Sequence, residues 1–509
     1  MVMLLHTDSL HVELLAPERL RHSSPVSPNT DPLHIELLAS ETVKPSFPPP
    51  NPKIESLHVE LLASEMIKPS SPPPYPIPLL RSCKLDHVIA NIYVKTVHFF
   101  SQLHGDFCDN SILKRSLAAT LSIFYPFAGT ITPAYDIVCN GNGSLFVDAK
   151  SNVYLSDLHD LIPHPRLLPL VPALDLSLDV TLRPLFMVQV TRFKCGGVAL
   201  GLAVEHHVAD GVSALMFLKT WSKIARGERI SVAPSFDKAW LHSPSSPPTK
   251  PRFQHDEYLL LPEPPSKQEQ LKHCADFHVP EEEQTVTGRF ELPWDLLHKL
   301  RLEAGADLTV YEMLAAHVWK CCCEARCLTD AEQSMLIMVV DGRARLGGDH
   351  HNFIGNAIFN CCPRLRVADI RRMSLAELGR FIAAALRSVN DELCRSAIDF
   401  LEDCSEDQLR RFVKGKHTFR SPNIGFISWA GLPFFEVDLG CSGACSVIPV
   451  DMPWEGHAYL IPSQKTYYPP SPVITNDKKR GLCLCIALQR RHISSFARLV
   501  TRETELQAV

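Results

Sequence analysis

The chain contains 509 residues, of which 45% are hydrophobic and 21% are charged, and its formal net charge at pH 7 is −5. This length allows two or three domains with sizeable cores, and the slightly acidic balance gives no reason to expect a nucleic-acid partner. No apolar run approaches the ~18 residues that a membrane-spanning helix needs, so we expect no membrane partner either.

The first 75 residues contain a short motif three times: LHVELLA at 10–16, LHIELLASE at 33–41 and LHVELLASE at 57–65. Each copy has the pattern of one short strand, and the second and third copies continue into proline-rich tails. Such a unit cannot bury a face by itself, and prolines resist stacking into a sheet. We therefore expect that only the third copy joins a sheet and that residues 1–55 form a disordered extension.

Strand and helix patterns alternate between residues 56 and 235, which we assign to an N-terminal domain. The turn signal Asn140-Gly-Asn-Gly143 favours a β-hairpin over 137–147. The mostly apolar segment 198–204 predicts a buried strand. The other elements predicted here are strands over 88–100 and 185–192, a helix over 112–124 and a helix that begins at Val212.

A proline-rich stretch over 236–284 has little regular pattern and is typical of a long connection between domains. The remainder, 285–509, mixes strands and helices without strict alternation, so we expect two α/β layers joined by this crossover. The predicted strands are 286–292, 335–340, short strands between 424 and 449, and 481–488. Two predicted helices span 311–325 and 376–393, and two more begin at 293 and at 492.

Cys321, Cys322 and Cys323 lie with Cys327 at the end of a helical pattern, and no second ligand pair stands at the spacing of a zinc site. We expect buried free thiols and no metal. The 17 cysteines are an odd number, and no secretory signal pattern precedes them. Together these features favour reduced thiols and a cytoplasmic location.

Two histidines, an aspartate and a glycine follow the predicted buried strand: His206, His207, Asp210 and Gly211. A neutral imidazole with a pKa near ~6.5 is well matched to taking a proton from a hydroxyl or amine. The carboxylate could orient that ring, or it could hold the turn through an arginine elsewhere. Gly211 would let the backbone turn sharply or approach a ligand closely, and His207 is expected to be structural.

Taken alone, a His-x-x-x-Asp pair is weak evidence, because it arises often by chance. Other mechanisms lack their residues: the chain has no Gly-x-Ser-x-Gly, phosphate-binding loop, His-Glu-x-x-His or dinucleotide-binding glycine motif.

The segment 206–211 (HHVADG) resembles the His-x-x-x-Asp-Gly signature of the plant BAHD acyltransferases, which move an acyl group from coenzyme A to an alcohol or an amine. The resemblance covers nearly the whole chain from Leu57 onward. Further matching segments follow in family order: YPFAG at 125–129, VDGRAR at 340–345, GNAIF at 355–359 and SWAGLP at 428–433. Five matches in the right order are far more specific than any one of them.

Within the family, the segments 85–88, 311–319 and 417–425 are most similar to hydroxycinnamoyl-CoA:shikimate or quinate hydroxycinnamoyltransferases. The resemblance implies an α/β (α+β) fold of two chloramphenicol-acetyltransferase-like domains with an active-site tunnel between them. It also implies an acyl-CoA co-substrate, a small hydroxyl- or amine-bearing acceptor that enters from the other face, and no permanently bound cofactor. We expect a monomer.

By resemblance, His206 is the general base. Asp210 is expected to point away from it and to pair with an arginine, for which Arg343 and Arg345 are the candidates. Trp429 matches a residue that helps to hold the tetrahedral intermediate.

Several positions depart from the family pattern. The second signature, Asp-Phe-Gly-Trp-Gly, is DLGCS at 438–442, which keeps Asp438 and Gly440 as expected structural residues at the active site. Lys414 replaces an arginine that grips the acceptor carboxylate, and Ile427 replaces a threonine near the developing oxyanion.

Val94, Thr96 and His98 also differ from the threonine, serine and tyrosine that usually line the acceptor site in the family. These changes leave the acceptor open. Two rival interpretations are a peptide-synthetase condensation domain, which shares a related motif, and a catalytically weak binding or regulatory homologue of the same fold.

Overall fold

The computed structural model describes residues 57–72, 79–101, 108–158, 162–175, 177–230, 232–245, 248–259, 281–412, 414, 418–440, 446–463 and 481–502. The predictions for 1–55, including the first two copies of the repeat, lie outside the described residues, as does much of the crossover. The third copy forms strand β1 (Val59–Ile67), as predicted.

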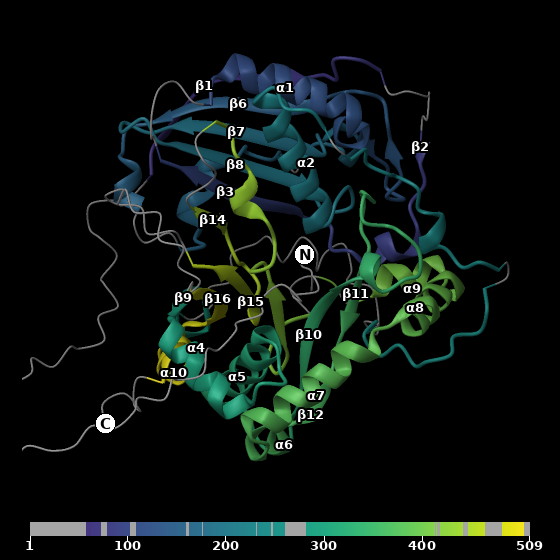
Figure 1. The fold of residues 1–509 in the computed structure, drawn as a ribbon, viewed down its shortest axis with the longest axis vertical. Helices are drawn as coiled ribbons and strands as arrows, with labels where there is room; N and C mark the ends of the chain where they lie inside the picture. The colour runs from purple at the N-terminus through teal and green to yellow at the C-terminus, as the bar shows by residue number, and fades with distance from the viewer. Residues whose placement is uncertain are drawn as a thin grey trace, which may run out of the picture. The chain divides into compact units, whose positions relative to one another are not determined.

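The first sheet has six strands, and its last strand comes from the far end of the chain (Figure 1). Strand β14 pairs antiparallel with β3, so the segment assigned to the second domain contributes to the first sheet. In sheet order the strands are β1, β6 (Ser144–Ser151), β7 (Phe186–Arg192), β8 (Val198–Glu205), β3 (Tyr93–Phe100) and β14 (Ser446–Pro449).

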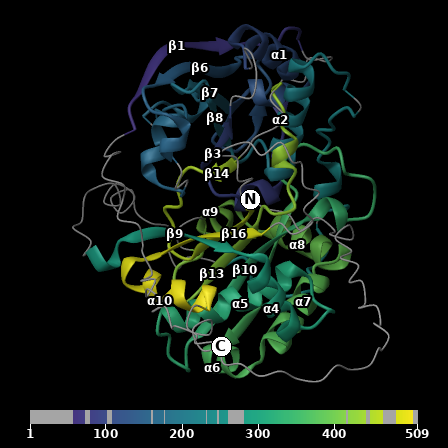
Figure 2. The ribbon, with the colours of Figure 1, turned by 60° about the vertical axis from the view of Figure 1, so that its left-hand side comes forward.

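Helices α1 (Asn110–Ile123) and α2 (Gly211–Ala225) lie beside each other against this sheet (Figures 1 and 2). The buried indole of Trp221 on α2 donates to the Leu113 carbonyl and to Ser116 Oγ of α1, at 3.2 and 3.0 Å. Phe186 of β7 packs against the same indole. This packing fixes α2 on the sheet and with it the polar cluster at its N-terminus.

The predicted hairpin over 137–147 is wrong. Strand β5 (Ile137–Val138) pairs with β2 (Leu79–Leu80) and β4 (Thr130–Ile131) in a small separate sheet, whereas β6 pairs with β1 and β7. Gly141 and Gly143 do adopt positive φ, so the turn exists, but the strands that it joins enter different sheets. A local turn signal cannot specify that choice.

The second sheet contains seven strands with the order β11-β10-β13-β15-β16-β9, and β12 also pairs with β10. Its bounds, in chain order, are β9 (Thr285–Leu292), β10 (Gln333–Asp341), β11 (Ile358–Cys361), β12 (Arg364–Arg366), β13 (Ile424–Ser428), β15 (His457–Pro462) and β16 (Leu482–Gln489). The two parallel pairings, β10 with β13 and β13 with β15, lie at its centre.

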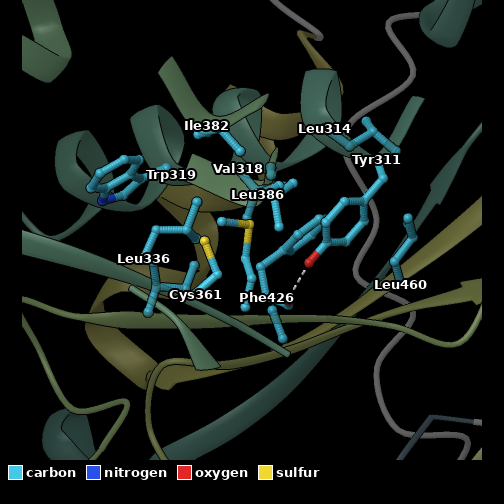
Figure 3. Packing of buried hydrophobic residues seen from close by; sticks show 14 of the residues in the cluster. Tyr311, Leu314, Val318, Trp319, Leu336, Cys361, Ile382, Leu386, Phe426 and Leu460 are labelled. Atoms are coloured by element: carbon cyan, nitrogen blue, oxygen red, sulfur yellow. Dashed lines mark hydrogen bonds between the residues drawn. The ribbon is translucent and has the colours of Figure 1, made fainter. Parts of the chain in front are cut away.

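A large apolar core lies between this sheet and its helices (Figure 3). Within it the hydroxyl of Tyr311 donates to the Phe426 carbonyl at 2.7 Å, and the two rings stack. The helices are α4 (Trp294–Ala304), α5 (Val310–Ala325), α6 (Val367–Arg372), α7 (Leu375–Ser388), α8 (Asp391–Asp403), α9 (Glu406–Arg411) and α10 (Arg490–Thr501). The three consecutive cysteines are buried in α5 as free thiols.

The single helix predicted over 376–393 is two helices, α7 and α8. Asn390 caps α8, because its side chain accepts from the Leu393 amide at 3.0 Å, and this cap separates the two. The short 3₁₀ helices are η1 (Lys84–Val88), η2 (Tyr125–Ala128), η3 (Leu155–Leu158), η4 (Pro165–Leu170), η5 (Val180–Leu182), η6 (Ala239–Leu241), η7 (Glu281–Glu283), η8 (Gly342–Ala344) and η10 (Phe434–Glu436).

The architecture agrees with the predicted α/β fold of two sheet-and-helix halves. Among the described residues, no helix is both long and apolar enough to cross a membrane.

Candidate active site

The polar cluster lies where β8 ends and α2 begins. Every residue of β8 is buried, and a turn over 206–208 follows it. Asp210 then caps α2, because its side chain accepts from the Ser213 amide at 3.0 Å. A rigid strand and a capped helix therefore hold the cluster from both sides.

Asp210 pairs with Arg343, which η8 places at the end of β10 in the second sheet. The guanidinium donates to both carboxylate oxygens at 2.7 and 3.2 Å, and the two side chains are only 1% and 3% exposed. Arg343 also donates to Asp341 and to Ser213 Oγ, each at 2.9 Å. Of the two candidate arginines, the structure thus pairs Arg343 with Asp210, and Arg345 is not among the partners of this carboxylate.

Burial and charge shift the pKa values of this cluster in different directions. Burial would raise the pKa of Asp210, but the charge and hydrogen bonds of Arg343 outweigh it and lower that pKa. Burial would likewise lower the pKa of Arg343, which its two carboxylate partners raise. Burial raises the pKa of Asp341, which has Asp210 as a like-charged neighbour. The contacts of Arg343 with Asp210 and Asp341 therefore join the two sheets through one charged network.

Asp210 has no hydrogen bond to His206 among the described residues. Its oxygens accept from Arg343, from the Ser213 amide and, at 3.1 Å, from the Ala357 amide. Of the two roles considered for this carboxylate, the geometry favours holding the turn over orienting the imidazole.

His206 is 5% exposed, and its backbone amide donates to the Ile92 carbonyl at 2.9 Å. Within the described part of the chain, Nδ1 is buried without a hydrogen-bond partner. Burial lowers the pKa of His206 to about 3, which keeps the imidazole neutral at physiological pH. A neutral ring can accept a proton, and the lowered pKa makes it a weaker base than a free imidazole.

Of the two reasons considered for Gly211, a sharp turn of the backbone is not observed, and a close approach to a ligand stays a prediction. Gly211 is the first residue of α2 and its φ is not in the left-handed region, so the backbone conformation there does not require glycine.

Trp429 follows β13 and is 1% exposed. Its amide donates to the Leu460 carbonyl at 2.7 Å, and its ring lies 4.5 Å from Tyr459 and 5.2 Å from Phe434. Ile427, on β13, is 2% exposed and offers no hydrogen-bond donor on its side chain. An aromatic cluster therefore surrounds the tryptophan.

Thr96 and His98 are buried and lie on the same face of β3, because alternate residues of a strand share a face. His98 is fully buried, and neither ring nitrogen has a hydrogen-bond partner among the described residues. Its ring lies 6.0 Å from Phe434, which links it to the Trp429 cluster. Burial lowers the pKa of His98 to about 3.

Lys414 lies near the polar cluster through Tyr135, whose ring stacks on His207. Its ammonium donates to the His87 carbonyl and lies 5.8 Å from the centre of the Tyr135 ring. Burial lowers its pKa to about 8.

Asp438 and Gly440 lie away from the cluster, at the opposite end of α2. Asp438 accepts from the Gly440 amide at 2.8 Å, and its carbonyl accepts from Arg226, the residue that ends α2. A helix of 15 residues separates that end from Asp210 by about 22 Å. Both residues therefore lie outside the polar cluster, and a structural role for them stays a prediction.

A model of the Transferase family matches residues 57–501. The chain belongs to this family. Rosmarinate synthase from Plectranthus scutellarioides is 36% identical over 424 residues, which cover 81% of this chain and 92% of the relative. Shikimate O-hydroxycinnamoyltransferase from Nicotiana tabacum is 33% identical over 436 residues, covering 84% and 95%. The predicted BAHD membership is confirmed, and the chain is an acyl-CoA-dependent acyltransferase.

A solved structure of TRI101 from F. graminearum, complexed with coenzyme A and T-2 mycotoxin, has a TM-score of 0.61 with 15% identity and covers 82% of this acyltransferase and 96% of that chain. At this identity the likeness concerns the fold, and it confirms the predicted fold class.

Sequence reasoning missed three residues that support the turn over 206–208 of the acyltransferase. Glu205 looked like the end of a buried strand, yet its carboxylate binds His207. Asn356 lies in a family segment and donates to the His206 carbonyl at 2.8 Å. Tyr135 stacks on the His207 ring and gave no signal in the sequence.

Proposed function

We propose that this acyltransferase transfers a hydroxycinnamoyl group from coenzyme A to a hydroxyl or amine of a small acceptor, with His206 as general base. The observation that carries the proposal is a neutral, buried imidazole between a rigid strand and the capped helix α2, beside the ion pair that joins the two sheets. The hydroxycinnamoyl donor is supported by the similarity to shikimate O-hydroxycinnamoyltransferase.

In the proposed reaction the acceptor oxygen or nitrogen loses its proton to His206 as it attacks the thioester carbonyl. The tetrahedral intermediate then collapses, the carbon–sulfur bond breaks, and the coenzyme A sulfur takes the proton from the imidazolium. Because burial holds the pKa of His206 at about 3, proton transfer is best concerted with attack rather than complete before it. Trp429 is proposed to hold the intermediate.

The acceptor is proposed to bind between β3 and Lys414. A carboxylate such as that of shikimate or quinate would pair with the Lys414 ammonium as a point charge, without the fork of an arginine. The buried Thr96 and His98 would line the same site. We further propose that the protein works as a monomer in the cytoplasm, which suits the free cysteines of its described part.

A catalytically weak binding homologue is the second candidate, and one observation favours it. Ile427 fills the position next to the expected oxyanion with a buried apolar side chain. The loss of one such donor can cost up to ~3 kcal/mol of transition-state stabilisation.

The test is release of free coenzyme A by the full chain, measured by thiol detection with a panel of hydroxycinnamoyl-CoA donors and hydroxyl or amine acceptors. We expect His206→Ala to lower kcat by roughly 10²–10⁴. His351→Ala, which changes an exposed histidine, is the matched control and should retain full turnover.

Wild-type turnover in His206→Ala would exclude His206 as the base. If the unmodified chain binds acyl-CoA but transfers no acyl group to any acceptor of the panel, the binding homologue is favoured instead.

A further inference from the structure

The imidazole of His206 has no described side chain that orients it. Both carboxylate oxygens of Asp210 accept hydrogen bonds from Arg343 and from backbone amides. Nδ1 of His206 has no partner within the described part of the chain. A general base must nevertheless be held within a fraction of an ångström of the reacting atoms. Its orientation must therefore come from the backbone turn that carries it.

Glu205 holds this turn through both of its carboxylate oxygens. Oε2 accepts from the His207 backbone amide at 2.7 Å, and Oε1 accepts from His207 Nδ1 at 2.8 Å. Because a carboxylate only accepts, Nδ1 carries the ring proton. The two side chains are 3% and 1% exposed, so water does not compete for these bonds.

The ring of His207 is fixed from a second direction by Tyr135. The two rings are parallel within 5°, and their centres are 4.1 Å apart. Tyr135 has a φ of 64°, a left-handed conformation that is uncommon for a residue with a bulky side chain. Its place under the imidazole is thus set by the surrounding structure and not by the local preference of the backbone.

Asn356 fixes the same turn from the second half of the chain. Its amide nitrogen donates to the carbonyls of His206 and His207, at 2.8 and 3.2 Å. The carbonyl of His206 is therefore tied directly, and the amide and ring of the next residue are tied by Glu205.

We propose that Glu205 is a positioning residue of the acyl-transfer reaction: by clamping the amide and imidazole of His207 it fixes the turn on which His206 meets its substrate. The inference rests on the proposed role of His206. It assigns His207 to the support of the base, and it gives Glu205 a function that lies outside the His-x-x-x-Asp-Gly signature.

Two substitutions of Glu205 distinguish the effect of its side-chain volume from the effect of its hydrogen bonds. Glu205→Leu removes both acceptors and leaves the His207 amide and Nδ1–H unpaired. Glu205→Gln can keep both contacts, because its oxygen accepts from the amide and its NH₂ donates to Nδ1 once the ring proton moves to Nε2. That proton would be buried, since Nε2 has no partner among the described residues, so the rescue is partial. We expect Glu205→Leu to lower kcat by roughly 10–100-fold with little change in the KM for acyl-CoA, and Glu205→Gln to lower it less.

The deciding measurement is a double-mutant cycle with His206→Ala, in which kcat is measured by coenzyme A release. If Glu205 acts through His206, then Glu205→Leu should have no further effect once the imidazole is gone. An equal fold-loss in the presence and absence of His206 would overturn the proposal, since general destabilisation lowers both rates alike. Unchanged kcat in Glu205→Leu would also overturn it.

Asp349 and His351 provide a matched control, because they form the same carboxylate–imidazole pair two residues apart but are 79% and 64% exposed. Asp349→Leu should leave kcat unchanged. If Glu205→Leu does not fold, His207→Phe keeps a ring for stacking on Tyr135, removes the Nδ1 bond and enters the same cycle.

The two proposals fail in different ways. If His206→Ala retains wild-type turnover, the proposed base is wrong. If His206→Ala is inactive while Glu205→Leu turns over like the wild type, only the positioning role is wrong.

Discussion

Helix α2 has an aspartate–arginine pair at each of its ends, and the two pairs differ in burial and geometry. At the N-terminus Asp210 and Arg343 approach to 2.7 Å and are 1% and 3% exposed. At the C-terminus Asp438 and Arg226 are 4.0 Å apart and are 32% and 23% exposed. Both aspartates occupy aspartate positions of the two family signatures, so motif membership alone does not rank them.

Solvent explains why the two ends should differ. A buried pair cannot lose one partner without leaving the other as an uncompensated charge in a medium of low polarity. A partly exposed pair is screened by water, and its partners regain hydration when separated. The Arg343 guanidinium also binds Asp341 and Ser213, so its loss would disconnect several groups at once.

The largest effect is expected from Arg343→Met. This change leaves Asp210 and Asp341 buried side by side without their cation, which we expect to cost roughly 3–5 kcal/mol of unfolding free energy. Denaturant unfolding of the full chain measures it. Arg226→Met at the other end of α2 is the control and should cost less than ~1 kcal/mol.

If Arg343→Met and Arg226→Met lost equal amounts of unfolding free energy, burial would not explain a difference between the two ends of α2. The double variant Asp210→Asn/Arg343→Met sharpens this comparison, because removing both charges should cost less than the sum of the two single changes.

A medium effect is expected from Asp210→Asn. Asparagine can still accept from the Ser213 amide, but it loses the charge that faces Arg343, which we expect to cost roughly 1.5–3 kcal/mol. Activity should fall together with the melting temperature, because the same carboxylate caps the helix behind His206. If activity fell without a change in melting, Asp210 would be catalytic rather than structural.

The same variant has a signature in acid. The pKa of Asp210 is lowered from its ordinary value of 3.8, so its contribution to stability is complete above that value and is lost as the pH falls through the lower folded pKa. Unfolding of the wild type below pH 4 should therefore be steeper than that of Asp210→Asn. The pKa of Asp341 is raised, so this group affects the pH dependence of stability in the opposite direction. The measured quantity is therefore the difference in acid unfolding between the wild type and Asp210→Asn.

The comparison also shows what the sequence could reveal. Strongly periodic elements such as β8, α2 and α5 were predictable, because their apolar pattern follows the face that they bury. The ordered motifs identified the family and located His206. Spacing could not distinguish Arg343 from Arg345, because the two arginines stand two residues apart after the same strand and only the fold determines which one pairs with Asp210.

Other features depended on contacts between distant segments. The turn at Gly141 was correctly indicated, but the sheet that each flanking strand joins was not. Glu205 resembles a strand end in the sequence, and its role appears only when the His207 ring is placed beside it. Asp438 was assigned to the active site through its motif, whereas it contacts Arg226 at the end of α2 that lies about 22 Å along the helix from Asp210.

The smallest effect is expected at that distant end, from Asp438→Asn. Asparagine keeps an oxygen for the Gly440 amide, and the carbonyl that accepts from Arg226 belongs to the backbone and is unchanged. Only the partly exposed charge pair at 4.0 Å is lost, so unfolding free energy should fall by less than ~1 kcal/mol and kcat should stay within about twofold. Arg226 retains Glu228 at 2.7 Å, which limits the loss further. Asp438 lies on the segment that also carries Trp429 and Phe434. A tenfold fall in kcat with unchanged stability would therefore mean that a change at this end of α2 affects the active site through that segment.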